Sequence, residues 1–214
     1  MKKKNLIVSL SFFVAFLVWT VLLCIVDVKV VGPETAEVGF SAINTAFHNL
    51  TGVNMFLYDI TDLLSIIPLL SVIVMAFIGL IQLIKRKSIL KIDKDILALG
   101  GYYILVIALY LFFEVCVLNY RPILIEGVLE PSYPSSTTLL CLTVMPTVML
   151  QIGRRIKKKG LAVSLNLIIG IFTAFMVISR IISGVHWITD IIGGTLLSAS
   201  LLALYCSVLE NIKE

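Results

Sequence analysis

Long apolar runs separated by short polar stretches dominate the chain. A helix needs about 20 apolar residues to cross a hydrocarbon core about 30 Å thick. Runs near this length cover residues 6–26, 64–84, 96–118, 137–152, 161–182 and 190–209. The runs are continuous and do not alternate with polar residues, which favours helices over the strands of a β-barrel. We therefore expect an all-α, polytopic membrane protein with six transmembrane helices.

Prolines interrupt two of these runs, Pro68 in the second and Pro146 in the fourth. Neighbouring helices can satisfy the carbonyl that a proline frees inside a transmembrane helix. Both runs are therefore still predicted to be helical. The fourth run is the shortest, and Pro146 is a candidate kink.

Composition agrees with a membrane location. Apolar residues make up 59% of the 214 positions, charged residues only 14%, and the mean hydropathy is +1.07. Soluble domains usually contain about 45 to 50% apolar residues. We expect a single integral membrane domain over residues 1–214, surrounded by membrane lipids and without a nucleic-acid partner.

The first 26 residues permit two interpretations, because a basic start precedes an apolar run as it does in a signal peptide. The run is about 20 residues long, which exceeds an ordinary signal-peptide core. No pair of small residues suited to cleavage follows it in VDVKVVGPE. The sequence therefore favours a retained first helix.

The basic residues predict the orientation. Fourteen of the 17 lysines and arginines fall on one side of a six-span arrangement. They are Lys2, Lys3, Lys4, Lys85, Arg86, Lys87, Lys91, Lys94, Arg154, Arg155, Lys157, Lys158, Lys159 and Lys213. Basic loops stay in the cytoplasm, so both termini are predicted to be cytoplasmic. The short chain and Lys-rich loops are typical of a multi-pass protein of a bacterial plasma membrane.

Two of the remaining basic residues, Arg121 and Arg180, lie at boundaries on the opposite, extracytoplasmic side. His186 and Asp190 follow closely, in a chain that has only two histidines. Ionisable residues in membrane segments are rare and usually mark a functional site. We expect an anionic group to be handled at this face.

The largest loop, residues 27–63, contains a helical pattern. Phe40, Ile43, Phe47 and Leu50 recur every three to four positions, as in an amphipathic helix lying in the membrane interface. A packed lid is an equal alternative.

The four cysteines indicate neither metal nor redox chemistry. Each lies in or at the end of an apolar run, and none forms a C-x-x-C pair. They are Cys24, Cys116, Cys141 and Cys206. We expect them to be small buried hydrophobes, and we expect no metal site and no cofactor.

His186 and Asp190 are four residues apart, so they share one face if the last helix begins near residue 185. Asp190 can then accept a hydrogen bond from one imidazole nitrogen and leave the other as a nucleophile or base. The planar forks of Arg121 and Arg180 are suited to phosphate oxygens.

A second polar cluster, PSYPSSTT at 131–138, precedes the fourth run. Ser135, Ser136 and Thr137, together with the amides of a helix start, form a candidate anion seat. Each feature also has a simpler interpretation: a helix cap for the serines, a snorkelling side chain for an arginine, an interfacial anchor for the His-Trp pair. Their convergence on one membrane face favours a shared site.

Three short motifs within residues 114–194 resemble the signature of the type 2 phosphatidic acid phosphatase superfamily. They are Arg121-Pro122, Pro134-Ser135 and Ser179-Arg180-x5-His186-x3-Asp190. This superfamily includes lipid phosphate phosphatases and bacterial undecaprenyl-diphosphate phosphatases. The order of the motifs matches, and the third motif is complete.

The resemblance implies a six-span fold, an outward-facing site and hydrolysis through a phosphohistidine without a metal. It implies that His186 is the nucleophile and Asp190 its orienting partner. Arg121, Arg180 and Ser135 would bind the phosphate. Ser136, which belongs to the anion seat, is also expected to bind it.

Two positions depart from the family pattern. Glu114 replaces the lysine of the usual Lys-x6-Arg-Pro, and Thr137 replaces the histidine of Pro-Ser-Gly-His, the usual proton donor. An alkoxide leaving group needs that proton, and general acids typically contribute about a hundred- to ten-thousand-fold. A diphosphate expels a phosphate group whose second pKa is about 6. We therefore expect lipid-linked phosphates as substrates, with polyprenyl diphosphates preferred over phosphatidic acid.

Glu114 has two interpretations. It is either a replacement proton donor or a partner of Arg121 or Arg180 in an ion pair. The whole protein also has alternatives: a catalytically impaired homologue that binds or transports a lipid phosphate, or a structural subunit. The last of these leaves the clustered outer charges unexplained.

Overall fold

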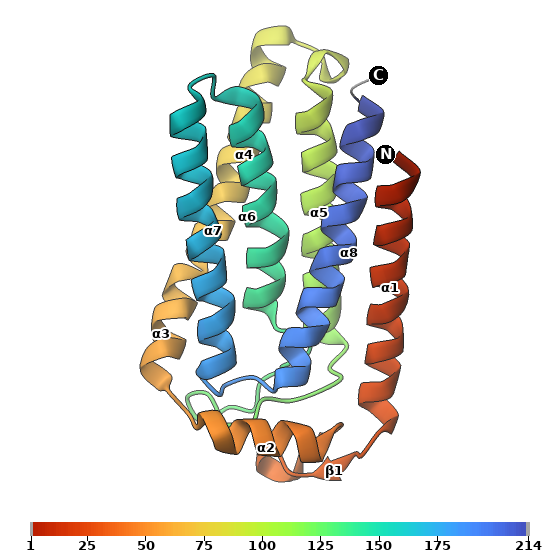
Figure 1. Cartoon of the computed structure of the whole chain (residues 1–214), viewed down its shortest axis with the longest axis vertical. Helices are drawn as coiled ribbons and strands as arrows, with labels where there is room; N and C mark the ends of the chain where they lie inside the picture. The colour runs from red at the N-terminus through yellow and green to blue at the C-terminus, as the bar shows by residue number, and fades with distance from the viewer. Residues whose placement is uncertain (1, 213–214) are drawn as a thin grey trace.

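The computed structural model describes residues 2–212. Within this range, six helical segments are long and apolar enough to cross a membrane, which confirms the all-α, six-span prediction. They are α1 (Lys2–Ile25), α3 (Met55–Leu64) continued by α4 (Ile66–Arg86), α5 (Lys94–Val115), α6 (Ser136–Arg155), α7 (Lys159–Ile182) and α8 (Ile188–Ile212). They stand side by side as one upright bundle (Figure 1).

The bundle has two distinct ends. The N-terminal end of α1 and the C-terminal end of α8 lie at the same end as the α4–α5 and α6–α7 connections (Figure 1). The short helix η2 (Ile89–Lys91) belongs to the first of these connections. At this end Arg155 bonds Asp95 at 2.9 Å and Arg86 bonds Asp93 at 2.7 Å.

Helices α6 and α8 form the interior. About half of the most apolar stretch of each is buried, 56% in α6 and 50% in α8, against 6 to 33% in the other four spans. Buried positions of α6 carry polar groups with protein partners: Thr147 bonds the Tyr103 hydroxyl at 2.8 Å, and Gln151 bonds that of Tyr205 at 3.2 Å. Lipid does not contact these groups, which explains why the fourth run is the shortest in the sequence. The helix continues through Pro146.

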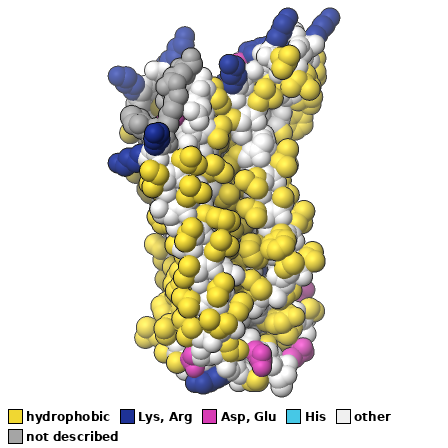
Figure 2. Space-filling view, turned by 90° about the vertical axis from the view of Figure 1, so that its right-hand side faces the viewer, with side chains coloured by type: hydrophobic (Ala, Val, Ile, Leu, Met, Phe, Trp, Pro, Cys, Tyr) yellow, Lys and Arg dark blue, Asp and Glu magenta, His cyan; other side chains and the backbone are white. Residues whose placement is uncertain are grey.

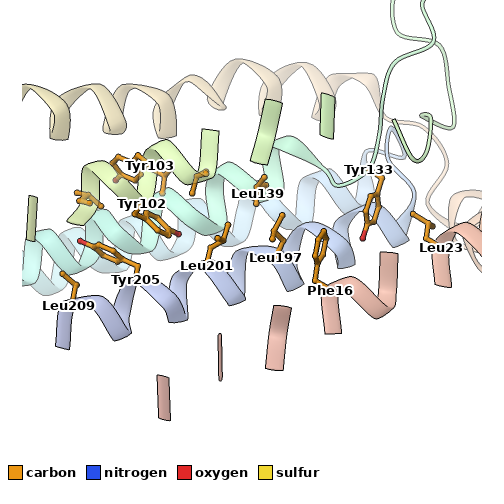
Figure 3. Packing of buried hydrophobic residues seen from close by; sticks show 13 residues of the cluster. Phe16, Leu23, Tyr102, Tyr103, Tyr133, Leu139, Leu197, Leu201, Tyr205 and Leu209 are labelled. Atoms are coloured by element: carbon orange, nitrogen blue, oxygen red, sulfur yellow. The ribbon is translucent and has the colours of Figure 1, made fainter. Parts of the chain in front are cut away.

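Aromatic side chains fill much of the core (Figure 3). Tyr102 packs on Tyr205 with ring centroids 4.9 Å apart, linking α5 to α8. Nearer the other end, the ring of Tyr133 stacks on Phe16 of α1, and its hydroxyl lies 2.7 Å from that of Thr20. The loop before α6 is thereby fixed to α1.

On the face shown in Figure 2, the middle of the bundle is covered by apolar side chains. Lys and Arg side chains gather at the end with the chain termini, and acidic side chains are prominent at the other end (Figure 2). Cys24 and Cys116 are exposed and only Cys141 is fully buried. The expectation of four buried cysteines was therefore wrong for the first two, because they lie at the C-terminal ends of α1 and α5, where neighbouring helices leave them uncovered. All four are free thiols.

The segment after α1 closes the second end. It contains a small hairpin, β1 (Lys29–Val30) paired antiparallel to β2 (Glu37–Val38) around η1 (Pro33–Thr35), and then α2 (Ser41–Thr51). Helix α2 lies across the end of the bundle (Figure 1). The predicted helix is present, and one of its faces packs on the protein as expected of a lid. Its polar Ser41 and Asn44 are buried against the protein, while Ile43 is 60% and Leu50 81% exposed.

Candidate active site

The loop between α7 and α8, residues 183–187, carries His186 at the end covered by α2. Gly184 has φ +67°, and a Cβ there would lie 1.9 Å from the carbonyl oxygen of Gly52. Only glycine fits this contact. The Ser183 carbonyl also accepts a hydrogen bond from the amide of Asn54 at 2.9 Å. The segment between α2 and α3 therefore packs directly on the His186 loop.

His186 and Asp190 are brought together, although not along one helix. Helix α8 begins at Ile188, so the expected start near residue 185 is three residues too early, and His186 lies before the helix. Nδ1 of His186 is still only 3.7 Å from Oδ2 of Asp190. His186 is 5% exposed and Asp190 is completely buried.

Ser132 connects this pair. Its hydroxyl donates to Oδ2 of Asp190 and lies 3.1 Å from Nδ1 of His186. Because the hydroxyl hydrogen is used on the carboxylate, the serine oxygen accepts the Nδ1 proton. This pattern assigns the imidazole tautomer with an unprotonated Nε2.

Asp190 accepts two further hydrogen bonds. The side-chain amide of Asn119 donates to Oδ1 at 3.1 Å, and the backbone amide of Trp187 donates to Oδ2 at 2.9 Å. Together with the serine hydroxyl, these donors suit an ionised carboxylate, which only accepts. A fixed negative charge beside the imidazole is the arrangement that stabilises positive charge developing on it.

The surroundings keep His186 neutral. Burial lowers its pKa to about 4, with the positive charges of Arg121 and Arg180 acting in the same direction and the nearby Asp190 opposing them. Desolvation disfavours the charged imidazolium. Near neutral pH the side chain therefore has a free lone pair on Nε2, as a nucleophile or base requires.

Arg121 and Arg180 meet over one aromatic ring. Their guanidinium carbons lie 5.5 and 4.8 Å from the centroid of Tyr58, within the range of cation–π contact. Arg121 is 9% and Arg180 1% exposed. The two predicted phosphate-binding arginines are therefore neighbours in the structure, although they are 59 positions apart (180 minus 121) in the sequence.

Each arginine has one carboxylate partner. Arg180 donates from Nη2 to Asp62 at 3.0 Å. Nε of Arg121 lies 3.1 Å from Oε2 of Glu130 as an ion pair without hydrogen-bond alignment. Nη1 of Arg121 and both Nε and Nη1 of Arg180 are buried without a hydrogen-bond partner in the described part of the chain. Buried unpaired donors are costly, and planar N–H groups of this kind are suited to the oxygens of an anion.

The predicted anion seat lies at the start of α6. Ser135 is buried, its amide donates to the Asp190 carbonyl at 3.2 Å, and its hydroxyl accepts from Thr138 at 3.1 Å. The hydroxyl accepts in this contact and keeps its own hydrogen for donation. Thr137 is 5% exposed. The loop before α6 packs closely on α8 because Gly193 has no side chain. A Cβ at position 193 would lie 2.4 Å from the Tyr133 ring.

One pocket unites several predicted positions. Its lining includes Tyr110, Glu114, Ser132, Tyr133, Ser136 and His186. Glu114 is exposed, and the arginines pair with Asp62 and Glu130. The ion pair of Glu114 with Arg121 or Arg180 is therefore not formed, because acidic residues of α3 and of the loop before α6 take that place.

Some contacts lie outside the motifs. Asn119 and Ser132 belong to the polar stretches noticed in the sequence, but no local pattern connects them to Asp190. Tyr58 and Asp62 belong to α3, which was expected to be mostly part of the large loop, and no pattern there indicated contact with the arginines. Within residues 3–212, no cluster of three or more His, Cys, Asp or Glu side chains is arranged to hold a metal ion.

Comparison with known proteins agrees with this architecture. A solved structure described as the first transmembrane PAP2 type phosphatidylglycerolphosphate phosphatase, from Bacillus subtilis, superposes with a TM-score of 0.62 and 19% identity, covering 97% of this chain and 98% of the other. That likeness shows the fold. No curated protein matches the sequence significantly. The family model of the PAP2 superfamily matches residues 97–214, which is more than half of the chain, and the chain therefore belongs to the PAP2 superfamily.

Proposed function

We propose that the chain is a membrane phosphatase that hydrolyses a lipid-linked phosphate or diphosphate, with a polyprenyl diphosphate preferred, through a phosphohistidine on His186. One observation carries this proposal: a buried, neutral imidazole with Nδ1 fixed by Ser132 lies in electrostatic reach of two buried arginines that have free N–H groups. These features support a nucleophile that acts beside a phosphate-binding site.

The proposed reaction has two steps. Nε2 of His186 attacks the terminal phosphorus, the bond from this phosphorus to the bridging oxygen breaks, and the lipid monophosphate leaves with the electron pair. Free N–H groups of Arg121 and Arg180 bind the phosphoryl oxygens, and Asp190 stabilises the positive imidazole ring. Water then attacks the phosphohistidine, which releases inorganic phosphate and restores the neutral imidazole.

The preference for a diphosphate follows from the leaving group. With Thr137 in place of a proton donor, an alkoxide would leave unprotonated, which general acid catalysis normally avoids. A phosphate monoester has a second pKa of about 6 and leaves as an anion near neutral pH. The structural neighbour is described as acting on phosphatidylglycerolphosphate, a phosphomonoester, and this lipid is the natural competitor substrate in a test.

The charge distribution supports an extracytoplasmic site. The basic loops lie at the end of the bundle with the chain termini, and the His186 loop lies at the other end. Because basic loops stay in the cytoplasm, the proposal places the termini inside and the site at the outer face of a plasma membrane, probed by labelling a cysteine near the α2 surface from outside.

The second candidate is a protein that binds or transports a lipid phosphate without hydrolysing it. The observation behind it is that Asp62 and Glu130 already balance the two arginines, while Thr137 replaces the proton donor. This candidate keeps the anion site and has no turnover.

Turnover by purified protein separates these functions. We expect undecaprenyl diphosphate to be hydrolysed at least tenfold faster than phosphatidate or phosphatidylglycerolphosphate, given the size of general acid effects. Equal rates on diphosphate and monoesters contradict the preference. Binding of these lipids without phosphate release identifies the second candidate.

A further inference from the structure

Helix α3 brings an aromatic side chain to the arginine pair from outside the three motifs. We infer that Tyr58 is a positioning residue that holds the guanidinium groups of Arg121 and Arg180 in the geometry that binds phosphate. The inference rests on the proposed anion site, and it adds α3 to the elements that build it.

The geometry gives Tyr58 two cationic neighbours. Its ring centroid lies 5.5 Å from the guanidinium carbon of Arg121 and 4.8 Å from that of Arg180. Two buried positive groups repel one another strongly where the dielectric constant is low. The negative face of an aromatic ring attracts both cations without occupying their hydrogen-bond donors. Tyr58 therefore keeps the two groups close while their N–H bonds remain available.

Asp62 completes this contact from the next turn of α3. It is four residues after Tyr58, on the same face of the helix, and it accepts one hydrogen bond from Nη2 of Arg180 at 3.0 Å. Nε and Nη1 of Arg180 stay unpaired. Helix α3 thus orients Arg180 with a ring and a single carboxylate oxygen, leaving two of its nitrogens for a ligand.

The helix that carries Tyr58 is itself fixed to the His186 loop. The Asn54 side chain caps α3 by accepting from the Leu57 amide at 3.0 Å, and the Asn54 amide donates to the Ser183 carbonyl at 2.9 Å. Gly184 lies against Gly52 just before α3. Tyr58 is therefore placed relative to both the arginines and the loop that holds the imidazole.

A ring that only fills space and a ring that positions the arginines predict different effects of truncating Tyr58. If Tyr58 only fills space, its truncation lowers the thermal unfolding midpoint and leaves affinity for phosphate unchanged. If it positions the arginines, truncation weakens the binding of phosphate and raises KM, while kcat changes less, because the imidazole keeps its own partners.

The test compares Tyr58→Leu and Tyr58→Phe in the full-length, detergent-purified protein, with inorganic phosphate as probe. We expect Tyr58→Leu to raise the inhibition constant of phosphate and the KM for undecaprenyl diphosphate about tenfold, as the loss of two partly buried cation–π contacts implies. Tyr58→Phe, which keeps the ring, restores both values to within about twofold. Phe56→Leu is the matched control, since Phe56 is 71% exposed on the same helix.

Two results overturn the inference: a Tyr58→Leu protein with an unchanged phosphate constant, or a Tyr58→Phe protein as impaired as Tyr58→Leu. If Tyr58→Leu does not fold, trifluorophenylalanine at position 58 replaces it, because fluorine weakens the negative face of the ring at nearly constant size. Phosphate inhibition must then weaken relative to Tyr58→Phe, and equal inhibition overturns the inference.

Binding measured without turnover separates this inference from the proposed hydrolysis. In the His186→Ala background, phosphate is expected to raise the thermal unfolding midpoint, and Tyr58→Leu is expected to remove that rise. This result supports the role of Tyr58 even if no substrate is hydrolysed. A His186→Ala protein that phosphate does not stabilise, whatever residue is at position 58, overturns the anion site and the inference with it.

Discussion

Nδ1 of His186 lies 3.1 Å from the hydroxyl of Ser132, a residue 54 positions earlier in the chain. The same hydroxyl donates to Asp190, so the serine connects imidazole and carboxylate, whose own atoms are 3.7 Å apart. The tautomer of the proposed nucleophile therefore depends on a side chain of the loop before α6.

Ser132→Ala tests this dependence. Loss of a hydrogen bond to a charged group costs about 1.5 to 3 kcal/mol, so we expect kcat to fall by roughly ten- to a hundredfold with KM little changed. Steady-state kinetics on undecaprenyl diphosphate measures both. Ser200→Ala is the control, because Ser200 is another buried serine, bonded to the Ser9 carbonyl in α1. Wild-type kcat in Ser132→Ala would show that Asp190 alone orients the imidazole.

The protonation of His186 gives a second prediction. Because the folded-state pKa is about 4 and an unperturbed histidine titrates near 6.5, the unfolded chain binds this proton between those pH values and the folded chain does not. The burial of neutral His186 therefore lowers the free energy of unfolding as the pH falls from about 6.5 to about 4, and it has no effect on this free energy above that range.

The pKa of His186 can be measured by NMR with ring-labelled histidine, since the chain has only two histidines. We expect the NMR signal of His186 to keep its neutral chemical shift from pH 7.5 to 5. His48→Gln assigns the signals by removing the other histidine. A midpoint near pH 6.5 for His186 contradicts the account, because it requires an imidazole that is open to water.

Restoring the missing acid is the third prediction. Thr137→His returns the residue that the family pattern has at this position. Since monoesters depend on a proton donor, we expect hydrolysis of phosphatidylglycerolphosphate to rise about tenfold or more and that of undecaprenyl diphosphate to change little. Thr137→Gln, similar in size and without a titrating group, is the control. An equal gain on both substrates, or a gain with glutamine, argues against proton donation as the cause.

Glu114→Gln tests the remaining alternative for that carboxylate. Glu114 lines the pocket that His186 lines and forms no pair with the arginines, so it opposes the binding of an anion. We expect removal of its charge to tighten phosphate binding by about 1 kcal/mol, or roughly fivefold, with kcat unchanged. Lost turnover instead identifies Glu114 as the proton donor. Glu126→Gln, a loop carboxylate outside the lining of this pocket, controls for the general loss of charge.

The spans were predictable because lipid imposes one length and one polarity on every helix that it surrounds. Two deviations have physical reasons. The second span begins at Met55, whereas the sequence predicted residue 64. The predicted start was too late because Asp59 and Asp62 interrupt the apolar pattern of α3. The fourth apolar run is short because α6 lies inside the bundle. There the polar Thr147 and Gln151 bond protein partners.

The site was only partly predictable. Arg180, His186 and Asp190 have a recognisable local spacing, and the structure brings them near Arg121. Ser132 and Tyr58 contact them through loop paths and helix packing, which periodicity does not encode. The interpretation of Glu114 as an arginine partner was wrong for the same reason, because the competing carboxylates come from distant segments.

The most direct test of the central claim is phosphate release from undecaprenyl diphosphate by the purified protein, measured beside His186→Ala. The account predicts release by the wild type that falls to background in the variant, with both proteins sharing the same thermal unfolding profile. Equal release by the two, or none by a folded wild type that still binds the lipid, contradicts hydrolysis through His186.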